Sequence, residues 1–261
     1  MTEADVVILD APEPLAHHVA ERLVAEITAA QAARGTASVV LTGGGMGGRT
    51  LTAVGDLDTG AVDWSRVDLW WGDERFVPAG DEERNDRQAR SALLDRLGLD
   101  PSRVHSVAAA DEVATAEEAA EHYAAELARV SEAEGNRPAD GTAVPAFDVL
   151  MLGVGPDAHV ASLFPELDAV TEQRATALAV HDAPKPPADR VTLTLPAINA
   201  ARQVWLVVAG ADKAGAVALA ANGAAAQQVP AAGVRGTDRT VWFLDSAAAS
   251  RLPERAGDDE G

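Results

Sequence analysis

Residues Phe147–Glu166 read FDVLMLGVGPDAHVASLFPE, and the fold class can be inferred from this segment outward. Its first part, Phe147–Val154, is almost continuously apolar, as expected for a strand covered on both faces. Strands of this kind belong to parallel sheets that lie between layers of helices. The second part turns through glycines to a histidine, His159, so a polar side chain follows directly on a buried strand.

Similar strands alternate with helices along the rest of the chain. Short β-branched or apolar runs predict strands, and apolar residues spaced four apart predict a helix face. The expected strands are Val6–Asp10, Ser38–Thr42, Val67–Trp71, Arg190–Leu195, Gln203–Ala209 and Val241–Leu244. The expected helices begin at Pro14 and at about Arg49, and cover Asn85–Leu97, Ala116–Glu132 and Asp212–Ala221. This alternation predicts an α/β fold with a mainly parallel sheet between helices.

The chain shows no internal repeat and no clear domain break. We therefore expect residues 1–252 to form one domain, with Gly135–Pro145 as a surface loop rich in Gly, Pro, Asn and Asp. The acidic segment 253–261 is expected to be a disordered tail.

Composition narrows the class of protein. The 261 residues are 47% hydrophobic, which suffices for a packed core. Cysteine is absent, so disulfides and thiolate metal sites are excluded. A formal net charge of −20 disfavours nucleic acid and anionic lipid as partners. The sequence has no signal-peptide pattern and no apolar run near the roughly 18 residues of a membrane helix, so we expect a cytoplasmic protein without membrane contact. We expect a monomer or a small homo-oligomer.

Three motif-bearing turns follow three of the expected strands: Gly43–Gly48, Gly72–Arg75 and Gly153–His159. In open α/β sheets, ligands bind beyond the carboxyl ends of the strands. We therefore expect these turns to share one edge of the sheet and to form an active site there.

The first turn matches G-x-G-x-x-G, through Gly43, Gly45 and Gly48. A dinucleotide site would need an acid about 20 residues later, but the candidate, Asp68, lies within a strand. We favour an anion site in which backbone N–H groups of Gly43, Gly44 and Gly45 approach a phosphate at a helix N-terminus. A purely structural turn is the remaining alternative.

The other two turns supply charge and a proton carrier. Arg75 offers a planar fork suited to phosphate, and Asp73 or Glu74 stands close by to orient it or to hold sugar hydroxyls; a surface ion pair is the alternative. His159 is suited to moving protons near neutral pH. Asp157 either caps the short helix that follows or orients the imidazole.

Further cations stand near the ends of other expected strands. Lys185 and Lys213 are the two lysines of a chain with 21 Lys and Arg residues in all, and Arg190 follows Lys185 in the loop KPPADR. We expect all three to face an anionic ligand, and His181 is a further candidate. The histidines show no zinc-like spacing, so neither a metal nor a cofactor is expected.

Together these motifs resemble the 6-phosphogluconolactonase family. The resemblance covers almost the whole chain, through WWGDERFVP (Trp70–Pro78) and the Asn85 that follows, LGVGPDAHVASLFPE (Leu152–Glu166), RVTLTLPAINAA (Arg190–Ala201) and VVAGADKA (Val207–Ala214). It implies a three-layer α/β/α sandwich with a Rossmann-like sheet, as in glucosamine-6-phosphate deaminases, ribose-5-phosphate isomerases and CoA transferases. It also implies hydrolysis of 6-phospho-D-glucono-1,5-lactone in the pentose phosphate pathway, with His159 as general base.

Three positions depart from the family pattern. Gly45 stands where a serine is usual, and we expect Arg49 to compensate for the missing hydroxyl. Ala158 replaces a glycine before the histidine, and Arg84 replaces a serine before Asn85. A glucosamine-6-phosphate deaminase, a sugar-phosphate isomerase and a non-catalytic sugar-phosphate sensor remain alternatives; Arg75 and Ser162–Pro165 favour the lactonase over the deaminase.

Overall fold

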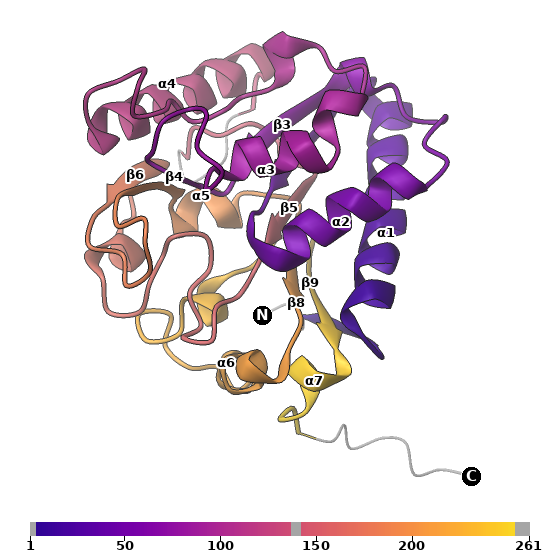
Figure 1. Ribbon diagram of the computed structural model, residues 1–261, viewed down its shortest axis with the longest axis vertical. Helices are drawn as coiled ribbons and strands as arrows, with labels where there is room; N and C mark the ends of the chain where they lie inside the picture. The colour runs from indigo at the N-terminus through magenta and orange to yellow at the C-terminus, as the bar shows by residue number, and fades with distance from the viewer. Residues whose placement is uncertain (1–3, 137–141, 254–261) are drawn as a thin grey trace.

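A computed structural model describes residues 4–136 and 142–253. Its centre is a six-stranded parallel sheet with the strand order β1-β9-β8-β5-β2-β3 (Figure 1). The strands are β1 (Asp5–Leu9), β9 (Arg239–Asp245), β8 (Gln203–Val208), β5 (Val149–Leu152), β2 (Ala37–Leu41) and β3 (Val67–Trp71). The predicted α/β class and the mainly parallel sheet are therefore confirmed.

Side chains of the sheet alternate between two apolar cores, one on each face. On β2, Val39 and Leu41 enter the core beneath α1 (Pro12–Arg34), α2 (Gly44–Asp56) and α3 (Asn85–Ala92). Val40, between them, enters the opposite core, which α4 (Ala116–Glu134), α5 (Leu195–Asn199), α6 (Ala214–Ala221) and α7 (Ser246–Ala249) cover. Because both faces are covered, the strands are mostly apolar, and the three-layer sandwich follows.

Most helix ends lie close to their predicted positions. α1 ends at Gly35, which takes the left-handed conformation (φ 82°) that glycine adopts readily. Thr115 caps α4, since its side chain accepts a hydrogen bond from the N–H of Glu118. The region predicted as one helix over Asn85–Leu97 is α3 followed by a 3₁₀ turn, Leu94–Arg96. Other 3₁₀ turns are Trp64–Arg66, Pro101–Arg103, Asp168–Thr171, Ala211–Lys213 and Pro230–Gly233.

A second, antiparallel sheet was not predicted. It has the order β4-β7-β6, formed by β4 (Asp73–Arg75), β7 (Arg190–Leu193) and β6 (Ala177–Val180). The strand expected at Arg190–Leu195 therefore forms over Arg190–Leu193, and it belongs to this second sheet. β7 alternates polar with apolar residues, and its Val191 and Leu193 pack onto the core beside α4. Such two-sided alternation is typical of an antiparallel ribbon over a core.

The second sheet adjoins the carboxyl ends of β2 and β3. Gly72 connects β3 to β4; its N–H donates to Leu41 of β2 and its carbonyl accepts from Leu193 of β7. The β4 residues and the β6–β7 connection are thereby held beside the sheet edge at which the site was expected.

Among the described residues, no helix is both long and apolar enough to cross a bilayer. The predicted loop Gly135–Pro145 lies partly outside the described residues. The predicted tail 253–261 lies outside them except for Pro253.

Candidate active site

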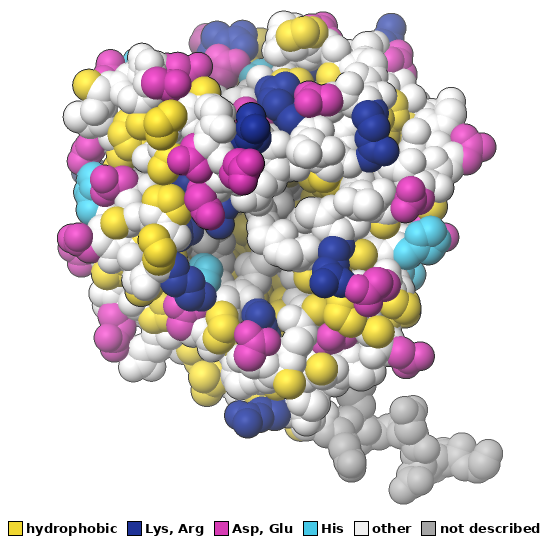
Figure 2. Space-filling model, viewed as in Figure 1, with side chains coloured by type: hydrophobic (Ala, Val, Ile, Leu, Met, Phe, Trp, Pro, Cys, Tyr) yellow, Lys and Arg dark blue, Asp and Glu magenta, His cyan; other side chains and the backbone are white. Residues whose placement is uncertain are grey.

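The three predicted turns surround one cavity of about 540 Å³ at the carboxyl ends of the parallel strands. Figure 2 shows this face hollowed, with Lys, Arg and His side chains at the rim of the hollow. The lining includes most of the expected site residues, namely Gly43, Gly44, Gly45, Arg49, Asp73, Arg75, His159, Lys185, Arg190 and Lys213. Residues far apart in the sequence thus meet because their strands end at the same edge.

The glycine segment forms the first turns of α2 and not a loop before it. We expected the helix to begin near Arg49, but it begins at Gly44, with Gly43 as its N-cap residue. No side chain caps this end, so the first N–H groups of α2 are available to an anion in the cavity. Gly43 is required by close packing, because a Cβ there would lie 1.9 Å from Oδ1 of Asn85.

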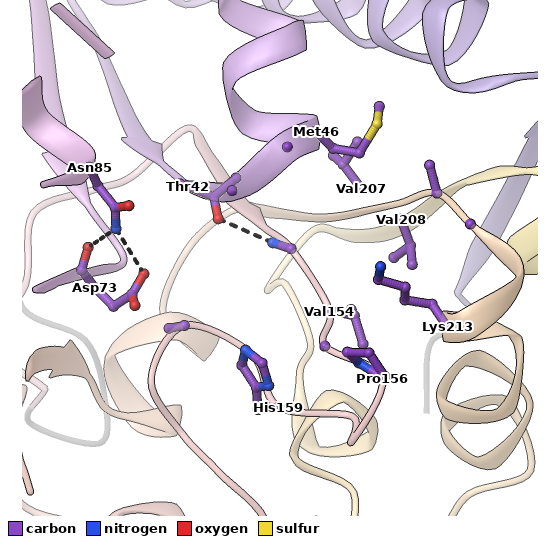
Figure 3. Close-up of a pocket in the computed structure, with 18 of the residues that line it drawn as sticks. Thr42, Met46, Asp73, Asn85, Val154, Pro156, His159, Val207, Val208 and Lys213 are labelled. Carbon is purple, nitrogen blue, oxygen red and sulfur yellow. Dashed lines mark hydrogen bonds between the residues drawn. The ribbon is translucent and has the colours of Figure 1, made fainter. Parts of the chain in front are cut away.

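The glycine turn before His159 is tied to the end of β2. The N–H of Gly153 donates to Oγ1 of Thr42 over 3.1 Å (Figure 3). A Cβ at Gly155 would lie 2.1 Å from two ring atoms of His159, so the imidazole packs directly against the bare backbone. The N–H of Gly155 donates to the carbonyl of His159. This N–H is therefore already engaged and does not face a ligand as a free donor.

His159 points into the cavity, with its side chain 17% exposed (Figure 3). Its Nδ1 lies 2.5 Å from Oδ1 of Asp157. Partial burial opposes ionisation of Asp157, but the hydrogen bond with His159 and the charges of His159 and Lys185 outweigh burial and lower the pKa of Asp157 to about 2. An ionised Asp157 accepts a hydrogen bond from Nδ1–H, which fixes the tautomer and leaves Nε2 as the basic nitrogen.

Ala158 takes the left-handed conformation, with φ 68°. This backbone conformation favours glycine, the residue that the family resemblance predicts at this position. The residue is almost fully buried, its N–H donates to Gly155, and its carbonyl accepts from the N–H of Ala231. The turn that carries His159 is therefore held from both sides despite the unfavourable residue.

Asp73, Arg75 and Asn85 form a hydrogen-bonded group on one wall. Nδ2 of Asn85 donates to the carbonyl of Asp73 over 2.8 Å and approaches Oδ1 at 3.4 Å (Figure 3). Oδ1 of Asn85 accepts from Nη1 of Arg75 over 2.7 Å. Nε of Arg75 is buried and has no hydrogen-bond partner in the described part of the chain. Asn85 was not predicted as a site residue; it was noted only as part of the family pattern, at the start of a helix.

Arg190 supports the loop that carries Lys185. Its Nε donates to the carbonyl of Pro187 and its Nη2 to that of Lys185, over 3.0 and 2.9 Å. Its Nη1 lies 4.0 Å from Oδ2 of Asp73, which also accepts a 2.7 Å hydrogen bond from the buried hydroxyl of Ser162. Burial lowers the pKa of Arg190, while Asp73 opposes that shift.

The remaining two cations of the lining are each paired with an acid. Nζ of Lys213 lies 2.6 Å from Oδ2 of Asp212, next to it in the chain. Arg49 pairs with the exposed Glu13 at the start of α1. An anionic ligand would therefore compete with a carboxylate for each of these side chains.

Two other predicted candidates lie elsewhere. His181 is not among the lining residues; its ring nitrogens contact Asp189 and Glu117, each over 2.7 Å. His181 lies close to Lys185 in the sequence, but its side chain contacts Asp189 and Glu117 while Lys185 lines the cavity. Asp68 pairs with Arg103 and His105, away from the glycine turn. Within the described ranges, no group of three or more His, Asp or Glu side chains is arranged to hold a metal.

Comparison with known proteins gives one consistent result. The family described as glucosamine-6-phosphate isomerases/6-phosphogluconolactonase matches residues 10–242. The 6-phosphogluconolactonase of Streptomyces coelicolor is 58% identical over 244 residues, covering 92% of each chain.

Solved structures agree with the fold. The 6-phosphogluconolactonase of Trypanosoma brucei superposes with a TM-score of 0.77 at 27% identity, over 96% of this chain and 99% of the other. A monomeric glucosamine-6-phosphate deaminase superposes with a TM-score of 0.76 at 18% identity, over 95% and 99% of the two chains, and shows the common fold alone.

Proposed function

Because the chain belongs to the glucosamine-6-phosphate isomerase/6-phosphogluconolactonase family, we propose that it hydrolyses 6-phospho-D-glucono-1,5-lactone to 6-phosphogluconate. The observation that carries the proposal is the His159–Asp157 pair at a cavity with five cationic side chains in its lining, those of Arg49, Arg75, Lys185, Arg190 and Lys213. A protein with a net charge of −20 otherwise repels an anionic substrate.

His159 is the general base in this proposal. Nε2 takes a proton from water, and the oxygen of that water forms a bond to C1 of the lactone. The tetrahedral intermediate then collapses, the bond from C1 to the ring oxygen breaks, and His159 returns the proton to that oxygen. Asp157 keeps Nδ1 protonated throughout and stabilises the transient imidazolium.

The oxyanion formed at C1 requires hydrogen-bond donors. The uncapped N–H groups of Gly44 and Gly45, at the start of α2, supply these donors in our proposal. The N–H of Gly155 does not, because it is already bonded to the carbonyl of His159. The phosphate is held away from the reacting carbonyl by Arg75, Arg190 and one or both lysines. No nucleophilic side chain is required.

The test measures the loss of lactone against its spontaneous hydrolysis, with the product coupled to 6-phosphogluconate dehydrogenase. We expect His159→Ala to lower kcat by roughly 10²–10⁴-fold, the usual contribution of general acid–base catalysis. The control is His122→Ala, because His122 is an exposed histidine on α4 outside the cavity.

Two results would contradict the proposal. One is a wild-type rate no higher than the spontaneous background, which would indicate a sugar-phosphate sensor. The other is release of ammonia from glucosamine 6-phosphate at a rate above that of lactone hydrolysis, which would indicate a deaminase.

A further inference from the structure

A buried pair of opposite charges lies directly behind the Asp73–Arg75–Asn85 wall. The side chains of Glu74 and Arg84 are 1% and 3% exposed, and Nη2 of Arg84 lies 3.7 Å from Oε2 of Glu74. Neither side chain lines the cavity. Charged groups are rarely buried to this extent, because removal from water is unfavourable unless other groups compensate.

The Glu74 carboxylate forms the cap of α3. Oε1 accepts from the N–H groups of Arg75 and Asn85 over 2.8 and 2.7 Å, and Oε2 accepts from the N–H of Asp86 over 2.9 Å. Asn85 and Asp86 are the first two residues of α3, so the carboxylate satisfies N–H groups that would otherwise lack partners. Three bonds of this kind require both carboxylate oxygens to act as acceptors.

Arg84 is anchored separately from Glu74. Its Nη2 donates to the carbonyl of Val107 over 2.6 Å, and its Nη1 approaches the carbonyl of Val77 at 3.5 Å. The guanidinium is therefore fixed against the loops around α3, with its charge next to the Glu74 carboxylate.

The cap determines where the Asn85 side chain lies. The backbone of Asn85 is bonded to Glu74, while its amide contacts Asp73 and Arg75 and packs against Gly43 at the start of α2. A shift of the first turn of α3 would thus move a group that contacts three parts of the cavity wall. We propose that Glu74 and Arg84 form a buried charge pair that positions Asn85, and with it Asp73 and Arg75, for substrate binding.

The electrostatics agree with this geometry. Burial raises the pKa of Glu74, and Arg84 followed by the three backbone N–H groups opposes that rise. Tyr123 of α4 is hydrogen-bonded to the backbone of Trp71; burial, and to a smaller extent the charge of Glu74, raise the pKa of its phenol, so the phenol stays neutral. Without Arg84, the pKa of Glu74 should rise further, and the cap should be lost as the pH falls.

The test compares Arg84→Met, Glu74→Gln and the double variant, with lactone hydrolysis as the readout; that readout rests on the proposed function. We expect each single variant to raise KM by roughly fivefold or more with a smaller change in kcat. Only Arg84→Met should show a new loss of kcat/KM on the acidic side, because a glutamine does not titrate. The double variant should have a lower KM than the product of the two single effects predicts.

Two further variants control for charge and fold. Arg87→Met removes an exposed arginine of α3 and should leave KM and the pH profile unchanged. Arg84→Lys keeps a buried positive charge and should keep the wild-type pH profile even where KM rises. It also keeps the proposal testable if Arg84→Met does not fold.

A second readout does not depend on the reaction. The side-chain amide signals of Asn85 in a ¹H–¹⁵N NMR spectrum should shift in Arg84→Met and Glu74→Gln, and stay in place in Arg87→Met. Unshifted Asn85 signals in folded variants would overturn the proposal, as would purely multiplicative KM effects or the same acidic loss in Arg84→Lys. Inactivity of the wild type towards the lactone would count against the proposed function alone, because the NMR result stands without it.

Discussion

At the scale of single residues, the site combines two alanines at positive φ, Ala158 and Ala161, with several close-packed polar side chains. Ala158 is held at φ 68° next to the proposed general base. Arg75 lines the cavity, and its Nη1 donates to the carbonyl of Glu83 and to Oδ1 of Asn85. We therefore expect substitutions of Ala158 to change stability and substitutions of Arg75 to change substrate binding.

We expect Ala158→Gly to change the free energy of unfolding little, within roughly 0.5 kcal/mol. Glycine relieves about 1 kcal/mol of backbone strain, but it removes a buried methyl group worth about 0.8 kcal/mol. Ala158→Val should destabilise the fold by about 2 kcal/mol or more, because a β-branched residue is poorly tolerated at positive φ. Urea unfolding measures both, and a valine variant as stable as the glycine variant would contradict this account.

Arg75→Ala is expected to raise KM more than it lowers kcat. A charged hydrogen bond to phosphate is present both before and during the reaction, and its loss should raise KM by roughly 10–100-fold. Arg75→Lys keeps the charge but not the planar fork, so its KM should lie between those of the wild type and Arg75→Ala. A large loss of kcat at unchanged KM would show instead that Arg75 acts mainly in the transition state.

At the scale of elements, the strands of the main sheet were predictable and the second sheet was not. Val67–Trp71 is mostly apolar and was predicted to the residue. β4 has only three residues, DER, and its pairing with β7 depends on a partner more than 100 positions away. α2 was predicted to begin too late because glycines are poor helix formers, yet the segment Gly44–Gly48 is helical.

The candidate site was likewise predictable in part: the residues in turns after parallel strands could be placed from the sequence, and the others could not. The turns that carry His159, Arg75 and Gly43 could be placed at one edge, because parallel strands end together. Asn85 could not, because it begins a helix, and its position depends on the Glu74 cap. The surroundings of Arg84 are equally non-local, since its bonds are to Val77 and Val107.

The connection between β6 and β7 provides a prediction about pH. Hydrogen bonds with Asp189 and then Glu117 raise the pKa of His181 above its ordinary value. A raised pKa in the folded state means that the contact stabilises the fold fully below about pH 6.5. The stabilisation is lost as the pH rises through the folded-state pKa.

His181→Gln should therefore be less stable than the wild type near pH 5.5 and equally stable near pH 9. The difference should be small, because the His181 side chain is about half exposed. Urea unfolding over a pH series measures it, with His122→Gln on α4 as the matched control. A difference that grows with pH would contradict the assignment.

At the scale of the whole molecule, charge is unevenly distributed. The formal net charge is −20, whereas five cationic side chains line one cavity. Like charges on a compact body repel one another, and salt screens this repulsion over about 8–10 Å at ordinary ionic strength. The acidic surface therefore lowers stability at low salt, while the cavity offers an anion local attraction.

We expect the Tm at pH 7.5 to rise when NaCl is increased from about 10 to about 150 mM, because screening weakens the self-repulsion. The rise should shrink near pH 4.5, where the sequence pI places the net charge close to zero. Differential scanning calorimetry at the two pH values measures both. A fall in Tm with salt at pH 7.5 would mean that specific ion pairs outweigh the general repulsion.

The pairing of β1 with β9 also sets an order of assembly during synthesis. β1 is made first, but its partner begins at Arg239, so the apolar run Val6–Leu9 cannot enter the sheet until almost the whole chain has emerged from the ribosome. β2 and β3 can pair much earlier, and β5 and β8 then add in turn. A chain that stalls before β9 would leave both β1 and the edge of β8 unpaired, and such exposed strands are sites of aggregation and of chaperone binding.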